Sequence, residues 1–350
     1  MASTRIPFDE AYTVVRSATE RLGITGDRGD LCARLFVEAT RDGVYSHGME
    51  RFPTFARAVA DGLVDVTARP RRVSGGGAIE RWDGCRGPGN LNAWSAMDRA
   101  MALAREHGVG AVSLGNTNHW MRGGSYGWQA ADAGLLALCW SNTLPNTSAA
   151  GEPPAVGNNP LVVALPRSAG PLVLDMALSQ FSVGVMTGYA QRGERLPVPG
   201  GFTAAGELTD VAADVVGGGH GAAIGRWKGF ALAVVLDAWA AMLSGGRATH
   251  ELGQDPARES GQTQFFLAVD PDAVGAPGER EQMVDGIVAA LKQAPGADGS
   301  ELRYPGEGTF RTRAENLAHG LPVRRATWEA LTSAGAPPAQ GTEDGGAQGQ

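Results

Sequence analysis

Apolar residues recur with helical spacing in three stretches near the N-terminus. The pattern predicts helices over residues 8–22, 28–41 and 50–62, which together indicate a helical N-terminal lobe. A longer helix is predicted from about Asn92 to His107, with Gly108 as its stop signal. Residues 227–243 have the length and spacing of a buried helix that ends at Gly245-Gly246.

Short apolar runs bounded by Gly, Pro or Asn alternate with these helices. They predict strands over residues 109–114, 135–140, 161–165, 172–174 and 265–269. Further helices are predicted over residues 278–293, 310–319 and 325–334. Alternating strands and helices favour an α/β fold. The segment 335–350 has no large apolar residue, so we expect it to be disordered.

Length and charge narrow the class of protein. The chain has 350 residues, 43% of them hydrophobic, and can therefore build two or more lobes around a substantial core. Its net charge of −7, without a run of Lys or Arg, gives no reason to expect nucleic acid or an anionic membrane surface as a partner.

Cysteine usage and the absence of a long apolar run bear on the compartment. Cys32, Cys85 and Cys139 are an odd number without CxxC spacing, which is typical of free thiols in a reducing environment. No uninterrupted apolar run reaches the roughly 18 residues of a membrane span. The first residues also lack the apolar stretch of a signal peptide, so we expect a cytoplasmic protein.

The glycine-rich run 217–222, GGGHGA, fits the GxGxxA pattern of a dinucleotide fingerprint and is followed by Asp237 about twenty residues later. In that fingerprint the acidic residue ends a second strand, whereas Asp237 lies inside the helical pattern of residues 227–243. We therefore interpret the run as a flexible loop and do not predict a Rossmann domain.

Residues 116–129, NTNHWMRGGSYGWQ, follow the predicted strand 109–114 directly. Loops at strand ends commonly carry function. Amides, an imidazole, a guanidinium and two indoles in this segment could bind and stack on a polar planar ligand, and its paired glycines allow close backbone approach. The alternative is a structural loop whose Trp side chains pack in the core.

His47 and Arg51 form a second set of candidate residues. If a helix begins at Gly48, Arg51 lies one turn beyond His47 and both can face one cavity. A histidine can donate a proton near neutral pH, and an arginine can bind a carboxylate with two hydrogen bonds. The alternative is a structural histidine and a solvated arginine.

Other reaction classes lack their motifs. No GxSxG segment precedes a predicted helix, which disfavours a serine hydrolase. No HExxH motif or clustered Cys, His and Asp set is present, so no metal site is predicted.

Seven ordered blocks resemble the malate/L-lactate dehydrogenase family of the non-Rossmann type. They are VYSHGMERFP (44–53), HGVGAVSLGNTNHWMRGGSYGWQAA (107–131), GNNPLVVALP (157–166), VLDMALSQFSVG (173–184), LPVPGG (196–201), RWKGFALAVVLD (226–237) and RYPGEG (303–308). The NHWMRGGSYGWQAA block is similar to the branch that reduces 2,3-diketo-L-gulonate.

The resemblance implies an L-sulfolactate/malate dehydrogenase-like fold with a mixed sheet, a helical N-terminal lobe and a central cofactor-binding lobe. The expected lobes are residues 1–75 with 300–334 for dimerisation, residues 76–122 with 255–299 as the α/β core, and residues 123–254 for the nicotinamide cofactor. A homodimer is expected.

The resemblance also implies the site. His47 would be the proton donor with Ser46 as support, Arg51 would bind the substrate carboxylate, and His119 would line the same pocket with Asn118 and Thr143. The cofactor contacts would be Val173, Leu174, Asp175, Met176, Ala177, Leu178, Ser179, Trp227, Lys228, Pro305, Gly306 and Glu307. Lys228 at the start of a long helix also suits a pyrophosphate.

The implied reaction is reduction of a 2-oxo acid to a 2-hydroxy acid by NADH, with NADPH as the alternative cofactor. The leading substrate is 2,3-diketo-L-gulonate. A cyclic imino acid such as piperideine-2-carboxylate, or a malate- or lactate-type substrate, is the alternative on the same fold. A metabolite-binding protein without catalysis is the hypothesis from another class.

Overall fold

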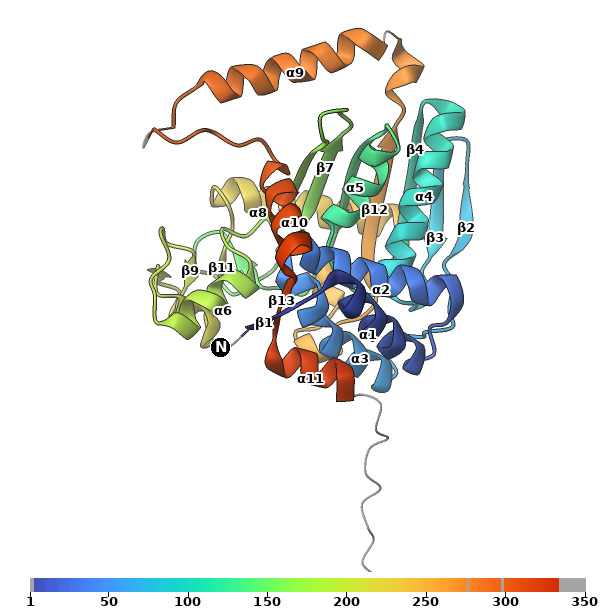
Figure 1. The fold of residues 1–350 in the computed structure, drawn as a ribbon. Helices are drawn as coiled ribbons and strands as arrows, with labels where there is room; N and C mark the ends of the chain where they lie inside the picture. The colour runs from blue at the N-terminus through green and yellow to red at the C-terminus, as the bar shows by residue number, and fades with distance from the viewer. Residues whose placement is uncertain (1–2, 276, 297–298, 334–350) are drawn as a thin grey trace, which may run out of the picture.

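The computed structural model describes residues 3–275, 277–296 and 299–333, and a mixed sheet of seven strands forms its centre (Figure 1). β3 and β4 run parallel, and the other neighbouring pairs run antiparallel. All five predicted strands belong to this sheet. In spatial order it comprises β2 (Arg71–Gly76), β3 (Ile79–Asp83), β4 (Val109–Thr117), β12 (Gln262–Val269), β5 (Leu136–Ser141), β7 (Leu161–Leu165) and β8 (Leu172–Met176).

Helices cover both faces of this sheet. α4 (Gly89–His107) and α5 (Gly124–Asp132) lie on one face, and α8 (Trp227–Ser244) lies on the other (Figure 1). Alternation along β4 places Val112 in the core beneath α4, while Ala111 packs toward α8. Strands buried on both faces are nearly continuous apolar runs, which is why the apolar pattern located them.

α8 is, among the described residues, the one helix whose length and composition would allow it to cross a membrane, with a mean hydropathy of 1.3 over 18 residues. The expectation that no uninterrupted apolar run reaches this length is not contradicted, because Lys228 and Asp237 interrupt the apolar sequence. Asp237 accepts hydrogen bonds from Asn142 and from the Thr249 backbone, and Leu236 packs against the sheet. Asp237 lies within α8 and not at the end of a strand. This agrees with the interpretation that residues 217–222 are not a Rossmann fingerprint.

The helical lobe joins the two ends of the described chain. α1 (Phe8–Arg21), α2 (Gly26–Arg41) and α3 (Phe52–Ala60) share a core with α11 (Arg325–Ser333), and α10 (Glu307–His319) packs beside α2. β1 (Ser3–Ile6) pairs antiparallel with β13 (Leu321–Arg324). The helices were predicted, but the two strands were not, because four residues carry too little pattern.

A small lobe is built mostly from the chain between β8 and α8, with β6 (Thr147–Ser148) added from the segment before β7. β6, β9 (Gly201–Phe202), β10 (Leu208–Thr209) and β11 (His220–Ala222) form a four-stranded sheet beside α6 (Val183–Arg192) and α7 (Ala212–Val216). The flexible loop expected at residues 217–222 is wrong for its second half, because residues 220–222 pair with β6 and β9.

The remaining helix, α9 (Pro277–Gln293), lies apart from the other helices at one end of the sheet (Figure 1). An ion pair of 2.6 Å between Arg167 and Asp285 links it to the loop after β7. Turns of 3-10 helix occur at Tyr45–His47, Met49–Arg51, Thr249–Glu251, Pro256–Arg258 and Pro271–Val274. The predicted disordered tail, residues 335–350, lies outside the described residues.

Candidate active site

His47 lies at the end of a 3-10 turn, just before a second one. The turns Tyr45–His47 and Met49–Arg51 are separated by Gly48, with φ of −96° and ψ of −138°. The condition that a helix begins at Gly48 is met only in part, because a 3-10 turn starts at Met49 and the α-helix α3 starts at Phe52. A Cβ on Gly48 would lie 2.2 Å from Thr40 Oγ1, and that hydroxyl accepts the Met49 N–H at 2.8 Å. Contact with α2 thus fixes the backbone that presents His47.

His119 lies on the loop after β4, and its ring stacks on that of His47. The ring centroids are 5.7 Å apart with an interplanar angle of 26°. Nδ1 of His119 accepts the backbone N–H of Met121 at 3.0 Å, so a neutral His119 carries its proton on Nε2. Ser46 Oγ lies 2.8 Å from His47 Nδ1 and holds that ring as well.

Asp175 on β8 faces the same space and also anchors α5. Its Oδ2 accepts the Gly124 N–H at 2.9 Å, at the start of that helix. A Cβ on Gly124 would lie 2.6 Å from this oxygen, so the glycine is needed for the contact. One carboxylate therefore fixes β8 to the helix that follows the His119 loop.

A cavity of about 370 Å³ brings these groups together, and we call it the histidine cavity. His47, His119 and Asp175 line it, together with polar groups from the same and other segments. These include Ser46, Arg122, Thr143, Asn158 and Ser182. The volume lies within the range of about 300–1,000 Å³ of small-molecule sites.

Burial controls the charge of both histidines. Desolvation lowers the pKa of His47 below 6.5, Asp175 opposes that shift, and Arg51 adds to it. Desolvation, with the positive charges of Arg51 and His47, lowers the pKa of His119 much further. His119 is therefore a neutral hydrogen-bond donor at pH 7, and of the two rings His47 is the one that gains a proton more readily.

Arg51 lies beside the histidine cavity, in a neighbouring cavity of about 490 Å³. The two cavities share His119 and Met121. Nη2 of Arg51 lies 3.4 Å from Oε2 of Glu259, and burial raises the pKa of that carboxyl. The carboxylate-binding role of Arg51 stays a prediction. Nothing in the polar loop before β12 pointed to Glu259 from the sequence.

The two other predicted substrate residues, Asn118 and Thr143, lie in different surroundings. The Asn118 amide donates to the Arg86 and Gly87 carbonyls and accepts from Ser260 Oγ, so it is committed to its loop. Thr143 lines the histidine cavity, and its hydroxyl donates to Asn158 Oδ1 at 2.8 Å.

The aromatic residues of segment 116–129 do not form an open stacking platform. Trp120 and Trp128 are buried in the main core, although both also line the histidine cavity. Trp120 packs on Tyr126 and Phe266. Residues 124–132 form α5, so only the first half of the expected loop is a loop.

Two of the three predicted cofactor segments are in direct contact, and the chain just before the third contacts the first. Val173 N–H donates to the Pro305 carbonyl at 3.0 Å at one end of the strand. Beyond its other end, Ile224 N–H donates to the Leu178 carbonyl at 2.9 Å, just before Trp227 and Lys228. Trp227 and Lys228 are exposed at the start of α8. Glu307 accepts the Tyr304 N–H and pairs with Lys292.

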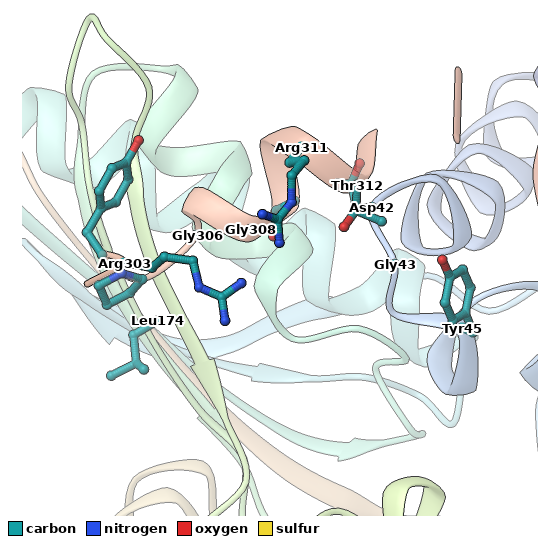
Figure 2. Close-up of a pocket in the computed structure, with 12 residues that line it drawn as sticks. Asp42, Gly43, Tyr45, Leu174, Arg303, Gly306, Gly308, Arg311 and Thr312 are labelled. Atoms are coloured by element: carbon teal, nitrogen blue, oxygen red, sulfur yellow. The ribbon is translucent and has the colours of Figure 1, made fainter. Parts of the chain in front are cut away.

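A third cavity, of about 570 Å³, adjoins the histidine cavity at Gly306 and Thr309, and we call it the arginine cavity (Figure 2). Arg303, Arg311 and Leu174 of β8 line it, while the strand neighbours Val173 and Asp175 line the histidine cavity. Both cavities combine charged, polar and apolar groups, and each lies within the volume range of small-molecule sites, so the residues present fit a dinucleotide with charged and apolar parts.

Comparison with known proteins identifies the class. Residues 6–332 match the model of the malate/L-lactate dehydrogenase family. The chain is 38% identical over 326 residues to the 2,3-diketo-L-gulonate reductase of Citrobacter koseri. The aligned region covers 93% of this chain and 98% of that protein.

Two solved structures show the same fold. Sulfolactate dehydrogenase from Methanocaldococcus jannaschii superposes with a TM-score of 0.88 at 23% identity, over 95% of this chain and 96% of that one. The Δ1-piperideine-2-carboxylate reductase of Pseudomonas syringae pvar. tomato superposes with a TM-score of 0.84 at 26% identity, over 95% of this chain and 99% of that one. The chain is an oxidoreductase that acts on CH–OH groups. It belongs to the malate/L-lactate dehydrogenase family, and its predicted non-Rossmann fold is confirmed.

Proposed function

We propose that this protein reduces a sugar-derived 2-oxo acid, with 2,3-diketo-L-gulonate as the leading substrate, to the 2-hydroxy acid. The observation that carries the proposal is the stacked His47–His119 pair in a cavity that also holds Asp175. The 38% identity to a 2,3-diketo-L-gulonate reductase supports the substrate class.

The residues of the histidine cavity would divide the chemistry between them. A bound reduced nicotinamide supplies the hydride to the 2-carbonyl carbon. His119 donates a hydrogen bond from Nε2 to the carbonyl oxygen, and His47 delivers a proton to that oxygen as charge develops there. Ser46 orients the His47 ring, and Arg51 neutralises the substrate carboxylate.

The wall of the histidine cavity supports a hydroxylated substrate. Arg122 is 5% exposed, lines the cavity, and has an Nε–H without a partner in the described part of the chain. Thr143 and Ser182 add hydroxyl groups to the wall. A site that binds substrate hydroxyls leaves its own groups unpaired when a smaller substrate lacks them.

Comparing substrates tests this proposal. We expect kcat/KM to be at least about tenfold higher for 2,3-diketo-L-gulonate than for pyruvate or oxaloacetate. Absorbance of the reduced nicotinamide would be followed with each acid and with piperideine-2-carboxylate, using both NADH and NADPH. A preference for the imine would favour the alternative that the 26% identical piperideine-2-carboxylate reductase suggests. Binding without turnover across the panel would favour a non-catalytic protein.

The pH profile of the reaction depends on His47. Reduction needs protonated His47, so kcat/KM for reduction should fall as pH rises through its pKa in the free enzyme, which burial places below 6.5. Oxidation of the 2-hydroxy acid needs the neutral ring and should rise over the same range. Because Asp175 favours the protonated form, Asp175→Asn should move both midpoints to lower pH. Unchanged midpoints in this variant would contradict the assignment.

We also propose that the protein acts as a homodimer in the cytoplasm. On α8, Val235, Trp239 and Met242 are 55%, 45% and 77% exposed and recur at helical spacing, which makes an apolar stripe that a second copy could cover. Light scattering should give twice the 36.3 kDa chain mass, and the chain mass alone would contradict the dimer. The three free thiols support a reducing compartment.

A further inference from the structure

The arginine cavity contains two cationic groups that nothing in the described chain neutralises. The guanidinium groups of Arg303 and Arg311 form no hydrogen bond or ion pair with any described residue. Figure 2 shows both side chains reaching into the space between β8 and the Tyr45 turn, one from the segment before α10 and one from α10 itself. Unpaired guanidiniums that converge on a cavity favour an anionic ligand.

The carboxylates near this cavity are already occupied. Asp42 lines it, but its oxygens lie 2.7 Å from Arg41, 2.6 Å from Arg122 and 2.7 Å from Arg313. Glu307, at the start of α10, pairs with Lys292 and accepts the Tyr304 N–H. The net charge that faces a ligand in the arginine cavity is therefore positive.

The backbone adds to this preference for an anion. α10 begins at Glu307, after Gly306 in the left-handed conformation with φ of 92°, and no side chain caps it. The first turn of this 13-residue helix, through Gly308 and Thr309, lines the arginine cavity. The Glu307 and Thr309 N–H groups donate to the Tyr304 and Gly306 carbonyls, so the contribution of this helix start to phosphate binding is mainly the positive end of the helix dipole.

The position of the arginine cavity relates it to the histidine cavity. The two share Gly306 and Thr309, and β8 forms a wall of both, with Val173 and Asp175 on one and Leu174 on the other. A dinucleotide whose nicotinamide lies beside His47 can therefore place its other end between Arg303 and Arg311.

We propose that the arginine cavity binds the 2′-phosphate of the adenosine ribose and makes NADPH the preferred cofactor. The inference rests on the proposed function, and it departs from the NADH preference implied by the resemblance alone. A phosphate monoester can accept charge-assisted hydrogen bonds from both guanidiniums, whereas the neutral 2′-hydroxyl of NADH cannot use their charge. The pyrophosphate is common to both cofactors and cannot discriminate between them.

Calorimetry on the full chain tests this inference without turnover. The dissociation constants would be measured for NADPH, NADH, 2′-phospho-ADP-ribose and ADP-ribose, with the wild type, Arg303→Gln and Arg311→Gln. Arg325→Gln is the matched control, because that exposed side chain pairs with Glu329 on α11, away from both cavities. Thermal unfolding of each variant would check that it folds.

We expect the wild type to bind each 2′-phosphorylated ligand at least about tenfold more tightly than its counterpart. Each cavity variant should lose about tenfold or more for those ligands and change by less than about twofold for the others. Equal affinities in the wild type would overturn the inference, while the proposed reductase would stand if NADH supports turnover. Equal loss for all four ligands would also overturn it, since the arginines would then bind the pyrophosphate. Failure of both cofactors to bind would contradict the inference and the proposed function together.

Discussion

We expect replacement of His47 by alanine to lower kcat/KM for reduction of the 2-oxo acid by a factor of about one hundred or more. The proposed proton donor to the developing alkoxide would be lost, and such a donor typically contributes about 10²–10⁴-fold. His119 cannot substitute for it, because burial keeps its ring neutral and its Nδ1 is bonded to the Met121 N–H. Steady-state rates with both cofactors would measure the effect.

His250→Ala is the control for this experiment. His250 is exposed in the 3-10 turn Thr249–Glu251 and lines none of the three cavities at the site. We expect that variant to keep its activity and both variants to keep their cofactor affinity. Full activity of His47→Ala would remove this residue from the chemistry, and lost cofactor affinity would assign it to binding instead.

Asp42→Asn should lower the free energy of unfolding by about 3–5 kcal/mol, as expected when one partner of a buried ion pair is removed. The Asp42 carboxylate joins α2, α10 and the loop before α5 through Arg41, Arg313 and Arg122. Arg122 is 5% exposed and would keep its charge without a counterion. Urea unfolding followed by circular dichroism would measure the loss.

An exposed pair provides the comparison. Asp61 and Arg57 form an i,i+4 contact of 3.3 Å on α3, with side chains 45% and 79% exposed, so Asp61→Asn should cost less than about 1 kcal/mol. Similar losses for Asp42→Asn and Asp61→Asn would contradict the structural role of the Asp42 cluster.

The pH dependence of stability follows from the same cluster. Burial disfavours the charged form of Asp42, but hydrogen bonds from Arg313 and Arg41 and the charge of Arg122 hold its pKa well below the usual range. A lowered pKa means that this stabilisation is present above the unfolded-state value of 3.8 and is lost as pH falls through the folded-state pKa.

Much of the sheet and most helices could be predicted because their apolar patterns are long or continuous. β4, β5 and α8 are buried on one or both faces. The spacing of apolar residues along the chain reflects which faces are buried, so it located these elements. The pairing of Ser3–Ile6 with Leu321–Arg324 could not be predicted, because it depends on contacts across nearly the whole chain. The helix α5 was missed because its first turn is fixed by Asp175, fifty-one residues away.

Part of the candidate site could also be predicted from the sequence, and part of it could not. The spacing of His47 and Arg51 and the family resemblance pointed to His47, which falls between the predicted helices 28–41 and 50–62. Its proximity to His119 and Asp175 depends on how β4, β8 and the 3-10 turns pack, which no local pattern encodes. Glu259 and the unpaired guanidiniums of Arg303 and Arg311 belong to polar segments, where sequence alone does not distinguish a site from a solvated surface.

The most direct test of the central claim is the fate of a labelled hydride. Reduced cofactor carrying deuterium at both hydrogens of nicotinamide C4 would be incubated with the enzyme and 2,3-diketo-L-gulonate, and the product analysed by mass spectrometry and proton NMR. We predict one deuterium on C2 of the 2-hydroxy acid. A product without deuterium at C2, or no product while both cofactors bind, would contradict hydride transfer to the 2-oxo carbon.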